Sequence, residues 1–519
     1  MEHCVYSFDH AHVVPEEDLK QLLGGKGFSL WLMRQRLGLP VPPGFTVSTQ
    51  ACVDVLASGG KLDDPLVAQI RGAVAKLEAE IGRSFGDVNA PLLVSVRSGA
   101  AASMPGMMDT LLNIGMTPAN TRALAQKTGN ESFAWGSYHR MLASYAKLVL
   151  GWNLKEDRPD LAEPEDSRFA AETLREMIAN DVGAENIDNP MYQLMSAVET
   201  VFASWNSPRA ISYRKRTGMS DAGGTAVNVQ AMVFGNFDDR SGTGVAFTRN
   251  PSTGAPGMCG DVLFNAQGDD VVSGEARTLE LNALEEHMPE IMAELVRAGE
   301  TLERHFRDLC DIEFTIEAGR LWMLQARIGK RSPAAAPRIA VDMVNECKVG
   351  LSRREALERI DGDLLSGKTE LENVAEGGQV IAKGLPTSPG VGSGKIVFSP
   401  DRAVELTDQG EHIILVRRET SPEDVHGMGV ANGIVTTLGG MMSHAAVVAR
   451  AWGIPAVCSA EGIELTGTEM KIGNDIYVEG DVISIDGGTG QIFRGEVGSA
   501  NWVDPYLQTL RNWAQVERA

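Results

Sequence analysis

The sequence predicts a multidomain protein that combines α/β and α+β structure. Its 519 residues are enough for roughly three domains of ordinary size. Segments with strand-like and with helix-like hydrophobic periods recur along the chain, and a linker rich in Pro, Ala and basic residues occupies 328–337. The composition is that of a globular protein, because 43% of the residues are hydrophobic and 22% are charged.

The net charge and the cysteines limit the classes of partner. The chain holds 47 Lys and Arg against 69 Asp and Glu, a formal net charge of −22, which argues against general binding of nucleic acid or anionic membranes. No apolar stretch is long enough to span a bilayer, and the N-terminus lacks the pattern of a secretory signal. The six cysteines are scattered and form no Cys-x-x-Cys motif. We therefore expect a cytoplasmic protein with no nucleic-acid or membrane partner.

Two N-terminal segments are candidates for contacts with phosphate. In the segment 23–30, Lys26 lies in a glycine loop that opens a helix, and both the close backbone approach and the lysine charge suit a phosphate group. Arg97 ends an apolar, strand-like run and precedes a loop of small residues, a setting that suits an oxyanion such as a phosphate chain. The alternatives are a structural turn with a surface lysine and an arginine paired with a carboxylate of the fold.

A predicted β-hairpin over 311–327 brings polar side chains together. With a three-residue loop, Glu313 lies opposite Gln325 and Asp311 lies opposite Arg327, all on one face because side chains alternate along a strand. Two carboxylates, an amide and an arginine on one face suit Mg²⁺ and phosphate oxygens. The alternative is a surface hairpin with a cross-strand salt bridge.

The segment 439–450 is the strongest single candidate for chemistry. An apolar run at 433–438 predicts a strand, two glycines predict a tight turn, and the following residues predict a helix that starts at His444. A helix N-terminus favours an anion, and neutral imidazole is a competent nucleophile near pH 7. Together these features predict a histidine that accepts a phosphoryl group, with a buried or capping histidine as the alternative.

These segments, in this order, resemble those of the phosphoenolpyruvate-utilising dikinases, the pyruvate, phosphate dikinase family. The resemblance extends from about residue 21 to the C-terminal helix, and the stretches around Arg97 and His444 are long and specific. The matching segments are the Lys26 loop, 92–109, 242–254, 311–327, 421–424 and 439–450.

The resemblance implies an ATP-grasp nucleotide-binding region followed by a swivelling β/β/α phosphohistidine domain. The expected N-terminal ATP-grasp part includes an acidic helical excursion, and the expected linkers are helical. The expected boundaries are 1–220 and 221–335 for the two ATP-grasp parts, 336–378 for a helical linker, 379–497 for the phosphohistidine domain and 498–519 for a C-terminal linker helix.

The resemblance also implies an activity with ATP and inorganic phosphate as substrates and Mg²⁺ as cofactor. The β-phosphoryl group of ATP passes to His444 through a pyrophosphoryl intermediate, AMP leaves, and the γ-phosphoryl group passes to phosphate as pyrophosphate. Residue by residue, Lys26 and Arg97 are expected to contact ATP phosphates, and Asp311 and Glu313 to hold Mg²⁺–ATP. The remaining expected contacts are Gln325 and Arg327 beside the metal, with Arg140, Thr248 and Arg249 as weaker phosphate-side candidates.

The sequence departs from the family pattern in two places. The family continues with a (β/α)₈ barrel that exchanges the phosphoryl group between the histidine and pyruvate. The last residues of this sequence, up to Ala519, resemble the linker helix that leads to that barrel. We therefore expect only the ATP-side half reactions, with the pyruvate or phosphoenolpyruvate barrel absent or on another chain. Two residues before the histidine, where the dikinases usually carry a regulatory threonine, this chain has Met442, so that control is expected to be absent.

Two other functions compete with the half-dikinase. One is a non-catalytic, nucleotide-binding regulator or partner of a full-length dikinase, and the other is a histidine phosphotransferase with a different acceptor. The presence of His444 together with the Lys, Arg and acidic candidates favours an enzyme, because a pure binding module does not need the histidine.

Overall fold

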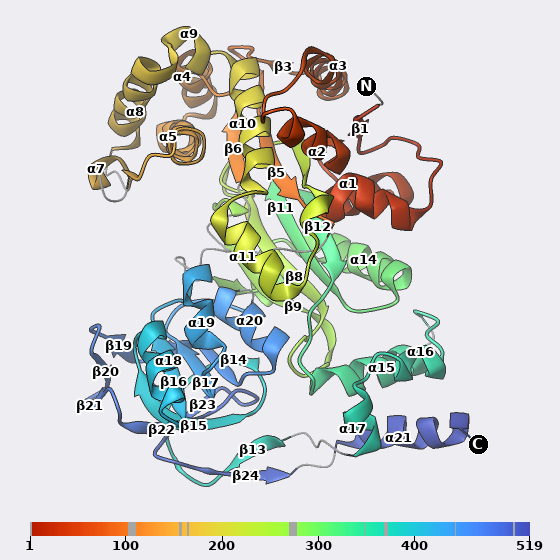
Figure 1. Cartoon of the computed structure of the whole chain (residues 1–519), viewed down its shortest axis with the longest axis vertical. Helices are drawn as coiled ribbons and strands as arrows, with labels where there is room; N and C mark the ends of the chain where they lie inside the picture. The colour runs from red at the N-terminus through yellow and green to blue at the C-terminus, as the bar shows by residue number, and fades with distance from the viewer. Residues whose placement is uncertain are drawn as a thin grey trace. The chain divides into compact units, whose positions relative to one another are not determined.

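The chain folds into two compact units in the computed structural model (Figure 1). The units are Met1–Phe237 with Trp322–Gln325, and Asp238–Leu321 with Ala326–Ala519. The residues described are 3–101, 110–154, 158–162, 166–268, 278–346, 348–367, 372–441, 443–501 and 504–518. The end of the matching segment 92–109 and Met442 lie outside the described residues, so the expectations attached to them stay predictions.

The first unit is built on an antiparallel sheet with the strand order β1-β2-β7-β5-β6. The central strand β7 is buried along its whole length, so its amide side chains need partners. Thr46 Oγ1 donates to Asn228 Oδ1 at 2.8 Å, and Gln230 Nε2 donates to the Pro42 carbonyl at 3.2 Å. The strands of the unit are β1 (Val5–Ser7), β2 (Gly44–Val47), β3 (Ser84–Phe85), β4 (Pro91–Leu92), β5 (Val94–Gly99), β6 (Thr110–Ile114) and β7 (Ala226–Ala231).

Helices of the first unit begin and end where capping residues allow. Before α3, the Asp63 carboxylate accepts from the Leu66 N–H at 3.0 Å, and Gly82 ends the helix at a φ of 71°. The helices are α1 (Glu16–Trp31), η1 (Leu32–Arg36), α2 (Thr49–Ala57), α3 (Asp64–Ile81), α4 (Pro118–Thr128), α5 (Glu131–Leu148), α7 (Pro159–Ala162), α8 (Ser167–Val182), α9 (Ala184–Ile187), α10 (Pro190–Ser204), α11 (Pro208–Thr217) and η2 (Asp221–Gly223).

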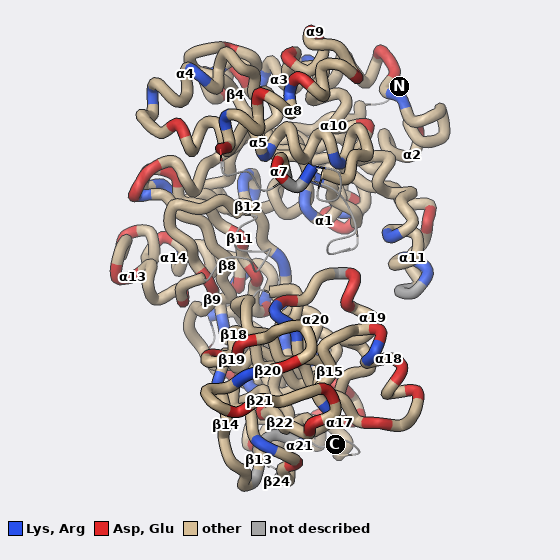
Figure 2. Tube along the Cα trace, turned by 90° about the vertical axis from the view of Figure 1, so that its left-hand side faces the viewer, with Lys and Arg blue, Asp and Glu red and all other residues tan. Residues whose placement is uncertain are grey.

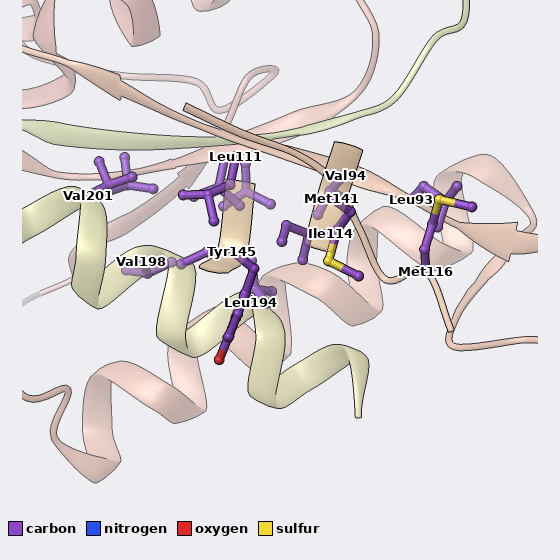
Figure 3. Close-up of a cluster of buried hydrophobic side chains, with 14 of the residues drawn as sticks. Leu93, Val94, Leu111, Ile114, Met116, Met141, Tyr145, Leu194, Val198 and Val201 are labelled. Carbon is purple, nitrogen blue, oxygen red and sulfur yellow. The ribbon is translucent and has the colours of Figure 1, made fainter. Parts of the chain in front are cut away.

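Helices α5 and α10 share a buried apolar cluster with β5 and β6 (Figure 3). Burying each such side chain contributes about 1.5–3 kcal/mol, so this cluster is a main source of stability for the unit. Its members include Val94, Leu111, Ile114, Met141, Tyr145, Leu194, Val198 and Val201.

The second unit begins with a five-stranded sheet in the order β10-β9-β8-β11-β12. Helix α14 packs against one face, because a Cβ built on its Gly299 would lie 2.4 Å from Met258 Cε and 3.1 Å from Thr248 Cγ2. The elements are β8 (Gly242–Arg249), β9 (Pro256–Phe264), β10 (Leu279–Glu280), α13 (Asn282–His287), α14 (Pro289–Phe306), β11 (Cys310–Glu317) and β12 (Arg320–Ile328).

The hairpin between β11 and β12 has a shorter loop than expected. Ala318 and Gly319 both have positive φ, 50° and 74°, as a two-residue type I′ turn requires. Arg320 already belongs to β12, so the expectation of a three-residue loop is wrong by one residue. Arg240 supports the turn, because its Nη2 donates to the Ala318 carbonyl at 2.6 Å and its own carbonyl accepts from Gly319 N at 2.8 Å.

Four helices then pack around a second apolar cluster that includes Ile339, Leu351, Leu364, Leu507 and Leu510. Three of them lie in the region expected to be a helical linker, and the fourth ends the described chain. They are α15 (Ala335–Asn345), α16 (Arg353–Leu357), α17 (Gly362–Ser366) and α21 (Pro505–Arg518).

The remaining part of the second unit is a closed seven-stranded barrel, β14-β18-β17-β16-β15-β22-β23. Strands β15, β16, β17 and β18 run parallel in sequence, with a helical connection after each of the first three. A two-stranded ribbon, β13–β24, and a three-stranded sheet, β19–β21, extend from the barrel. The elements are β13 (Glu372–Glu376), β14 (Gln379–Ser388), β15 (Val391–Val397), α18 (Pro400–Asp408), β16 (Ile413–Arg417), η3 (Pro422–Asp424), α19 (Val425–Met428), β17 (Gly433–Thr436), α20 (His444–Trp452), β18 (Ala456–Glu461), β19 (Ile463–Leu465), β20 (Glu469–Ile472), β21 (Asp475–Val478), β22 (Val482–Asp486), β23 (Gln491–Arg494) and β24 (Gly498–Asn501).

Surface charge is mixed in both units. Acidic and basic residues are interspersed along the helices and loops (Figure 2), and the acidic residues outnumber the basic ones, 69 to 47. Among the described residues, no helix combines the length and the apolar character needed to cross a bilayer.

A cluster of rings near the N-terminus predicts a stability that depends on pH. The His12 ring lies 5.0 Å from Tyr6, 4.6 Å from His10 and 5.8 Å from Trp31, between centroids. Burial, with the charges of His10 and His3, lowers the pKa of His12 from 6.5 to about 4. The unfolded chain therefore binds more protons than the folded chain between these values, so stability is complete above pH 6.5 and falls as the pH approaches 4.

We expect His12→Phe, which keeps the ring and removes the titration, to lose less stability than the wild type between pH 7 and pH 4.5. Thermal unfolding of both proteins at the two pH values measures this difference. An identical loss in the two proteins would show that folding does not lower the pKa of His12.

Candidate functional site

Helix α20 begins at His444, as the sequence predicts. Gly439, at a φ of 100°, reverses the chain after β17, and Ser443 caps the helix by accepting from the Ala446 N–H at 3.4 Å. Gly453, at a φ of 68°, ends the helix. The imidazole is therefore fixed in the first turn, where unpaired N–H groups favour an anion.

Thr420 orients the His444 ring. Its Oγ1 lies 3.0 Å from His444 Nδ1, and the described part of the chain offers Nε2 no hydrogen bond. Burial lowers the pKa of His444 below its ordinary value of 6.5, and Asp424 and Glu423 only partly oppose this. The ring is therefore neutral near pH 7, with Nε2 accessible as a nucleophile.

Asp424 holds the loop that carries Thr420. Its Oδ2 accepts from the Ser421 N–H at 2.9 Å, and its Oδ1 lies 3.4 Å from Arg417 Nη2. Sequence reasoning assigned no role to Thr420 or Asp424, although 421–424 belongs to a matching segment. The signal available in the sequence was a second apolar run, 413–416, that ends shortly before Thr420. If this run and the run at 433–438 form adjacent parallel strands, Thr420 lies beside the turn that precedes His444, because the carboxyl ends of parallel strands meet at one edge of a sheet.

Arg450, on the last turn of α20, is a third residue that sequence reasoning missed. It is 2% exposed, donates to the Thr387 carbonyl at 3.2 Å and to the Met441 carbonyl at 2.6 Å, and lies 5.4 Å over the Phe247 ring. Burial lowers the pKa of Arg450 to about 10, so it still carries its charge at neutral pH. The signal for it was a single charged residue in a helix of small and apolar residues.

The sheet of the second unit presents acidic side chains on the face that Arg450 contacts. Residues directly opposite on neighbouring strands share a face, and the registers of β8, β9 and β11 define two rows. The rows are Asp311–Phe247–Cys259 and Glu313–Val245–Asp261. We call Asp261, Asp311 and Glu313 the acidic sheet face, and Asp311 and Asp261 both attract the Arg450 charge.

Asp311 and Arg327 are brought together as the sequence predicts, although the loop is one residue shorter than expected. At the far end of the hairpin the Gly329 N–H donates to the Leu309 carbonyl at 2.9 Å, a register in which Asp311 lies opposite Arg327. Arg327 donates to Asp311 Oδ2 from Nε at 2.8 Å and from Nη2 at 2.7 Å. Burial raises the pKa of Asp311, although Arg327 acts in the opposite direction. Glu313 is two residues further along β11. Gln325 lies on β12, in the stretch Trp322–Gln325 that belongs to the first unit.

The donor chemistry of Asp311 and Glu313 fits Mg²⁺ carried by a nucleotide. In the described part of the chain, no group of three or more His, Cys, Asp or Glu side chains is arranged to hold a metal ion by itself. Magnesium commonly uses one or two carboxylates and takes its other ligands from phosphates and water, so two carboxylates at i and i+2 are sufficient.

Thr248 and Arg249 have partners within the protein. Thr248 Oγ1 accepts from the Cys310 N–H at 2.9 Å. Arg249 makes bidentate ion pairs with Glu303, at 2.9 and 3.0 Å, and with Glu346, at 2.9 and 2.7 Å. Although burial opposes its charge, Glu346 and Glu303 raise the pKa of Arg249. The described contacts of Arg249 tie β8 to α14 and to the end of α15, and its role as a phosphate contact stays a prediction.

Lys26 lies close to the end of β5, the strand that carries Arg97. The expected glycine loop before the helix is instead a kink within α1 at Gly24, whose φ is 67°. A Cβ built on Gly24 would lie 1.6 Å from the Gly99 carbonyl oxygen, so only glycine lets α1 approach the end of β5. That approach places Lys26 next to Gly99, two residues after Arg97.

The third basic candidate of the first unit, Arg140, is exposed on α5. Its contact with phosphate stays a prediction.

Comparisons with known proteins identify the class of this chain. Residues 61–283 and 278–348 match the family described as "Pyruvate phosphate dikinase, AMP/ATP-binding domain", and 409–490 match "PEP-utilising enzyme, mobile domain". The chain is thus a multidomain α/β protein that joins a nucleotide-binding part to a mobile domain of the phosphoenolpyruvate-utilising enzymes.

Its relatives then define the family. The chain is 45% identical to pyruvate, phosphate dikinase of Rhizobium meliloti (strain 1021) and 43% identical to that of Clostridium symbiosum, in each case over 96% of this chain and 58% of the relative. It is 42% identical to the chloroplastic pyruvate, phosphate dikinase 1 of Arabidopsis thaliana, over 99% of this chain and 55% of the relative. The chain belongs to the pyruvate, phosphate dikinase family, and it spans less than three fifths of the length of these relatives.

The Thr420 contact predicts the tautomer of His444. For Nε2 to act as the nucleophile, Nδ1 must carry the proton. Thr420 Oγ1 then accepts a hydrogen bond from the Nδ1–H group. We expect the Nδ1–H tautomer in the wild type and in Thr420→Ser, which keeps the hydroxyl group. In Thr420→Val we expect a shift toward the Nε2–H tautomer. Losing one hydrogen bond changes the free-energy difference between the tautomers by about 1 kcal/mol, which changes their ratio roughly fivefold. Long-range ¹H–¹⁵N NMR of protein labelled at histidine measures the tautomer. Equal spectra for Thr420→Val and wild type would contradict the prediction.

Arg249 also supports a prediction on stability. Arg249→Met removes one cation from two carboxylates and leaves buried Glu303 unpaired, so we expect a loss of about 3 kcal/mol in the free energy of unfolding. The matched control is Arg354→Met, which removes an exposed helical pair with Glu358 at 3.1 Å and is expected to cost less than about 1 kcal/mol. Urea unfolding measures both, and equal costs would show that the Arg249 pairs contribute no more than a surface pair.

Proposed function

We propose that this chain performs the ATP-side half of the pyruvate, phosphate dikinase reaction and transfers the β-phosphoryl group of ATP to His444. The observation that carries the proposal is the contact of α20 with the sheet: the helix that begins at His444 places Arg450 over Phe247, opposite Asp311 on the acidic sheet face. A phosphoryl acceptor and a pair of Mg²⁺-type carboxylates therefore belong to one compact unit. Family membership and the match to an AMP/ATP-binding domain support the same reaction.

The proposed chemistry has two steps. Nε2 of His444 attacks the β-phosphorus of ATP, the N–P bond forms, and the bond to the oxygen that bridges the α-phosphate breaks, so AMP leaves with that oxygen. An oxygen of inorganic phosphate then attacks the γ-phosphorus and the bond to the β–γ bridging oxygen breaks. Pyrophosphate leaves, and one phosphoryl group stays on His444.

The protein contributes positioning and charge, which are the main requirements of phosphoryl transfer. We assign Asp311 and Glu313 to Mg²⁺–ATP, with Gln325 and Arg327 beside them, and Mg²⁺ would neutralise charge that develops on the phosphates. Lys26 and Arg97 are assigned to the phosphate chain from the first unit, with Arg140, Thr248 and Arg249 as weaker contacts. Thr420 keeps the His444 ring oriented, and burial keeps it unprotonated.

The proposal includes the expected architecture and partners. The nucleotide-binding part is an ATP-grasp region over 1–220 and 221–335, joined by a helical linker, 336–378, to a swivelling phosphohistidine domain, 379–497, and a C-terminal helix, 498–519. The pyruvate or phosphoenolpyruvate barrel of the full reaction belongs to another chain or to a further part of a longer protein. The location is cytoplasmic.

Labelling with ATP tests the proposal. After incubation with Mg²⁺, phosphate and ATP labelled at the β-phosphorus, we expect acid-labile label on the wild-type protein, together with AMP and pyrophosphate. We expect no label on His444→Ala, and at most about one hundredth of the wild-type rate for Asp311→Ala, because a missing charge contact at a transferring phosphoryl group costs about 2.7 kcal/mol or more. The matched control is His426→Ala, which changes an exposed histidine paired with Asp401 in the same barrel and is expected to label normally.

The competing functions give different results. Equal labelling of His444→Ala and wild type would place the acceptor elsewhere and overturn the proposal. Binding of ATP without label and without AMP would identify a nucleotide-binding regulator. Label that forms on His444 and then passes to an acceptor other than pyruvate would identify a different phosphotransferase.

A further inference from the structure

Gly440 lies against the acidic sheet face, in the turn that precedes His444. A Cβ built on Gly440 would lie 2.3 Å from Asp261 Oδ2, 2.6 Å from Oδ1 and 2.6 Å from Cγ. All three atoms of the carboxyl group are within the forbidden distance, so rotation of the carboxylate about its own bond does not clear the space. Asp261 is itself 4% exposed, which leaves its side chain little room to move away.

The backbone of the turn does not explain why position 440 is glycine. Gly439 has a φ of 100°, so the turn itself requires glycine there. Gly440 is absent from the positive-φ residues of the chain, so alanine can adopt its conformation without strain. The three atoms nearest to a side chain at this position all belong to Asp261, on another part of the unit.

Two further contacts accompany this approach. Ser252, in the loop between β8 and β9, donates from Oγ to the Thr387 carbonyl of β14 at 2.9 Å. Arg450 lies over Phe247 on β8. The turn, the end of β14 and the last turn of α20 therefore contact one surface made of Ser252, Phe247 and Asp261, and each of these three residues is buried.

We propose that Gly440 is a docking residue: the missing side chain is what allows the barrel that carries His444 to contact the acidic sheet face at Asp261. A methyl group at position 440 separates the two surfaces and leaves the barrel folded. The partner of this surface is thus another segment of the same chain, and position 440 acts on the contact through side-chain volume rather than charge. The inference concerns the contact between the two parts and goes beyond the transfer reaction proposed above.

Cys259 provides a native probe of docking that needs no ATP. It lies opposite Phe247 on β9, on the face that Arg450 contacts, and burial raises the pKa of its thiol to about 12. Among the described free cysteines, the other four are fully buried. Cys259 is only partly buried, and the Arg450 charge acts on its thiol, so we expect loss of docking to expose it further. Its alkylation by iodoacetamide, followed by peptide mass spectrometry, then reports the docked fraction.

We expect Gly440→Ala to speed the alkylation of Cys259 by about tenfold, since overpacking of a close contact typically costs 1–3 kcal/mol. Adding Asp261→Ala, which removes all three clashing atoms, is expected to restore the slow wild-type rate. Adding Asp261→Asn, which keeps the volume and removes the charge, is expected not to restore it. The matched control is Gly498→Ala, a glycine of β24 whose Cβ would meet no atom within 4 Å, and it should alkylate as the wild type does.

The outcomes separate this inference from the proposed function. An unchanged alkylation rate in Gly440→Ala overturns the inference, and so does rescue by Asp261→Asn, because that result would make the contact electrostatic. Circular dichroism of each variant establishes that the barrel is folded, and an unfolded Gly440→Ala barrel would also overturn the inference. If wild type fails to label with ATP while Gly440→Ala still exposes Cys259, the docking inference holds and the proposed transfer fails.

Discussion

The contact of α20 with the sheet depends on one buried cation. Arg450 is enclosed by its own barrel, which supplies the Thr387 and Met441 carbonyls, and by the sheet, which supplies the Phe247 ring and two nearby carboxylates. Burying a charge costs free energy unless nearby polar or charged groups compensate it. Each of these groups is therefore held in position by its contact with Arg450. Because Arg450 lies on the helix that begins at His444, the same constraint sets where the nucleophile can lie relative to Asp311.

The local parts of the site could be predicted from the sequence. The start of α20 followed from an apolar run, two glycines and a small-residue helix, and the Asp311–Arg327 pair followed from strand alternation. Both depend on residues close in sequence, for which period and turn chemistry are sufficient. The Lys26 segment was predicted in part. Gly24 has non-helical backbone angles, as a glycine turn before a helix requires, but residues on both sides of it are helical, and the close Gly99 carbonyl accounts for the kink.

The rest of the site depends on which strands are neighbours, and sequence periodicity does not contain that information. Thr420 reaches His444 because β16 and β17 are parallel neighbours in a closed barrel. Arg249 shows the same dependence: at the end of β8 it forms ion pairs with Glu303 and Glu346, which come from distant parts of the sequence. In both cases the deciding partner is a residue far away in the sequence.

The ribbon of β13 and β24 has a consequence for how the barrel reaches its partners. These strands are the two connections of the barrel to the helices around α15 and α21, and they pair antiparallel along Glu372–Glu376 and Gly498–Asn501. A domain held by two paired connections explores a small volume, so its local concentration at any surface within reach is about millimolar or higher. Weak contacts, such as those at Asp261 and Phe247, are then sufficient to populate the bound arrangement, and they can be released quickly because no single one has to be strong.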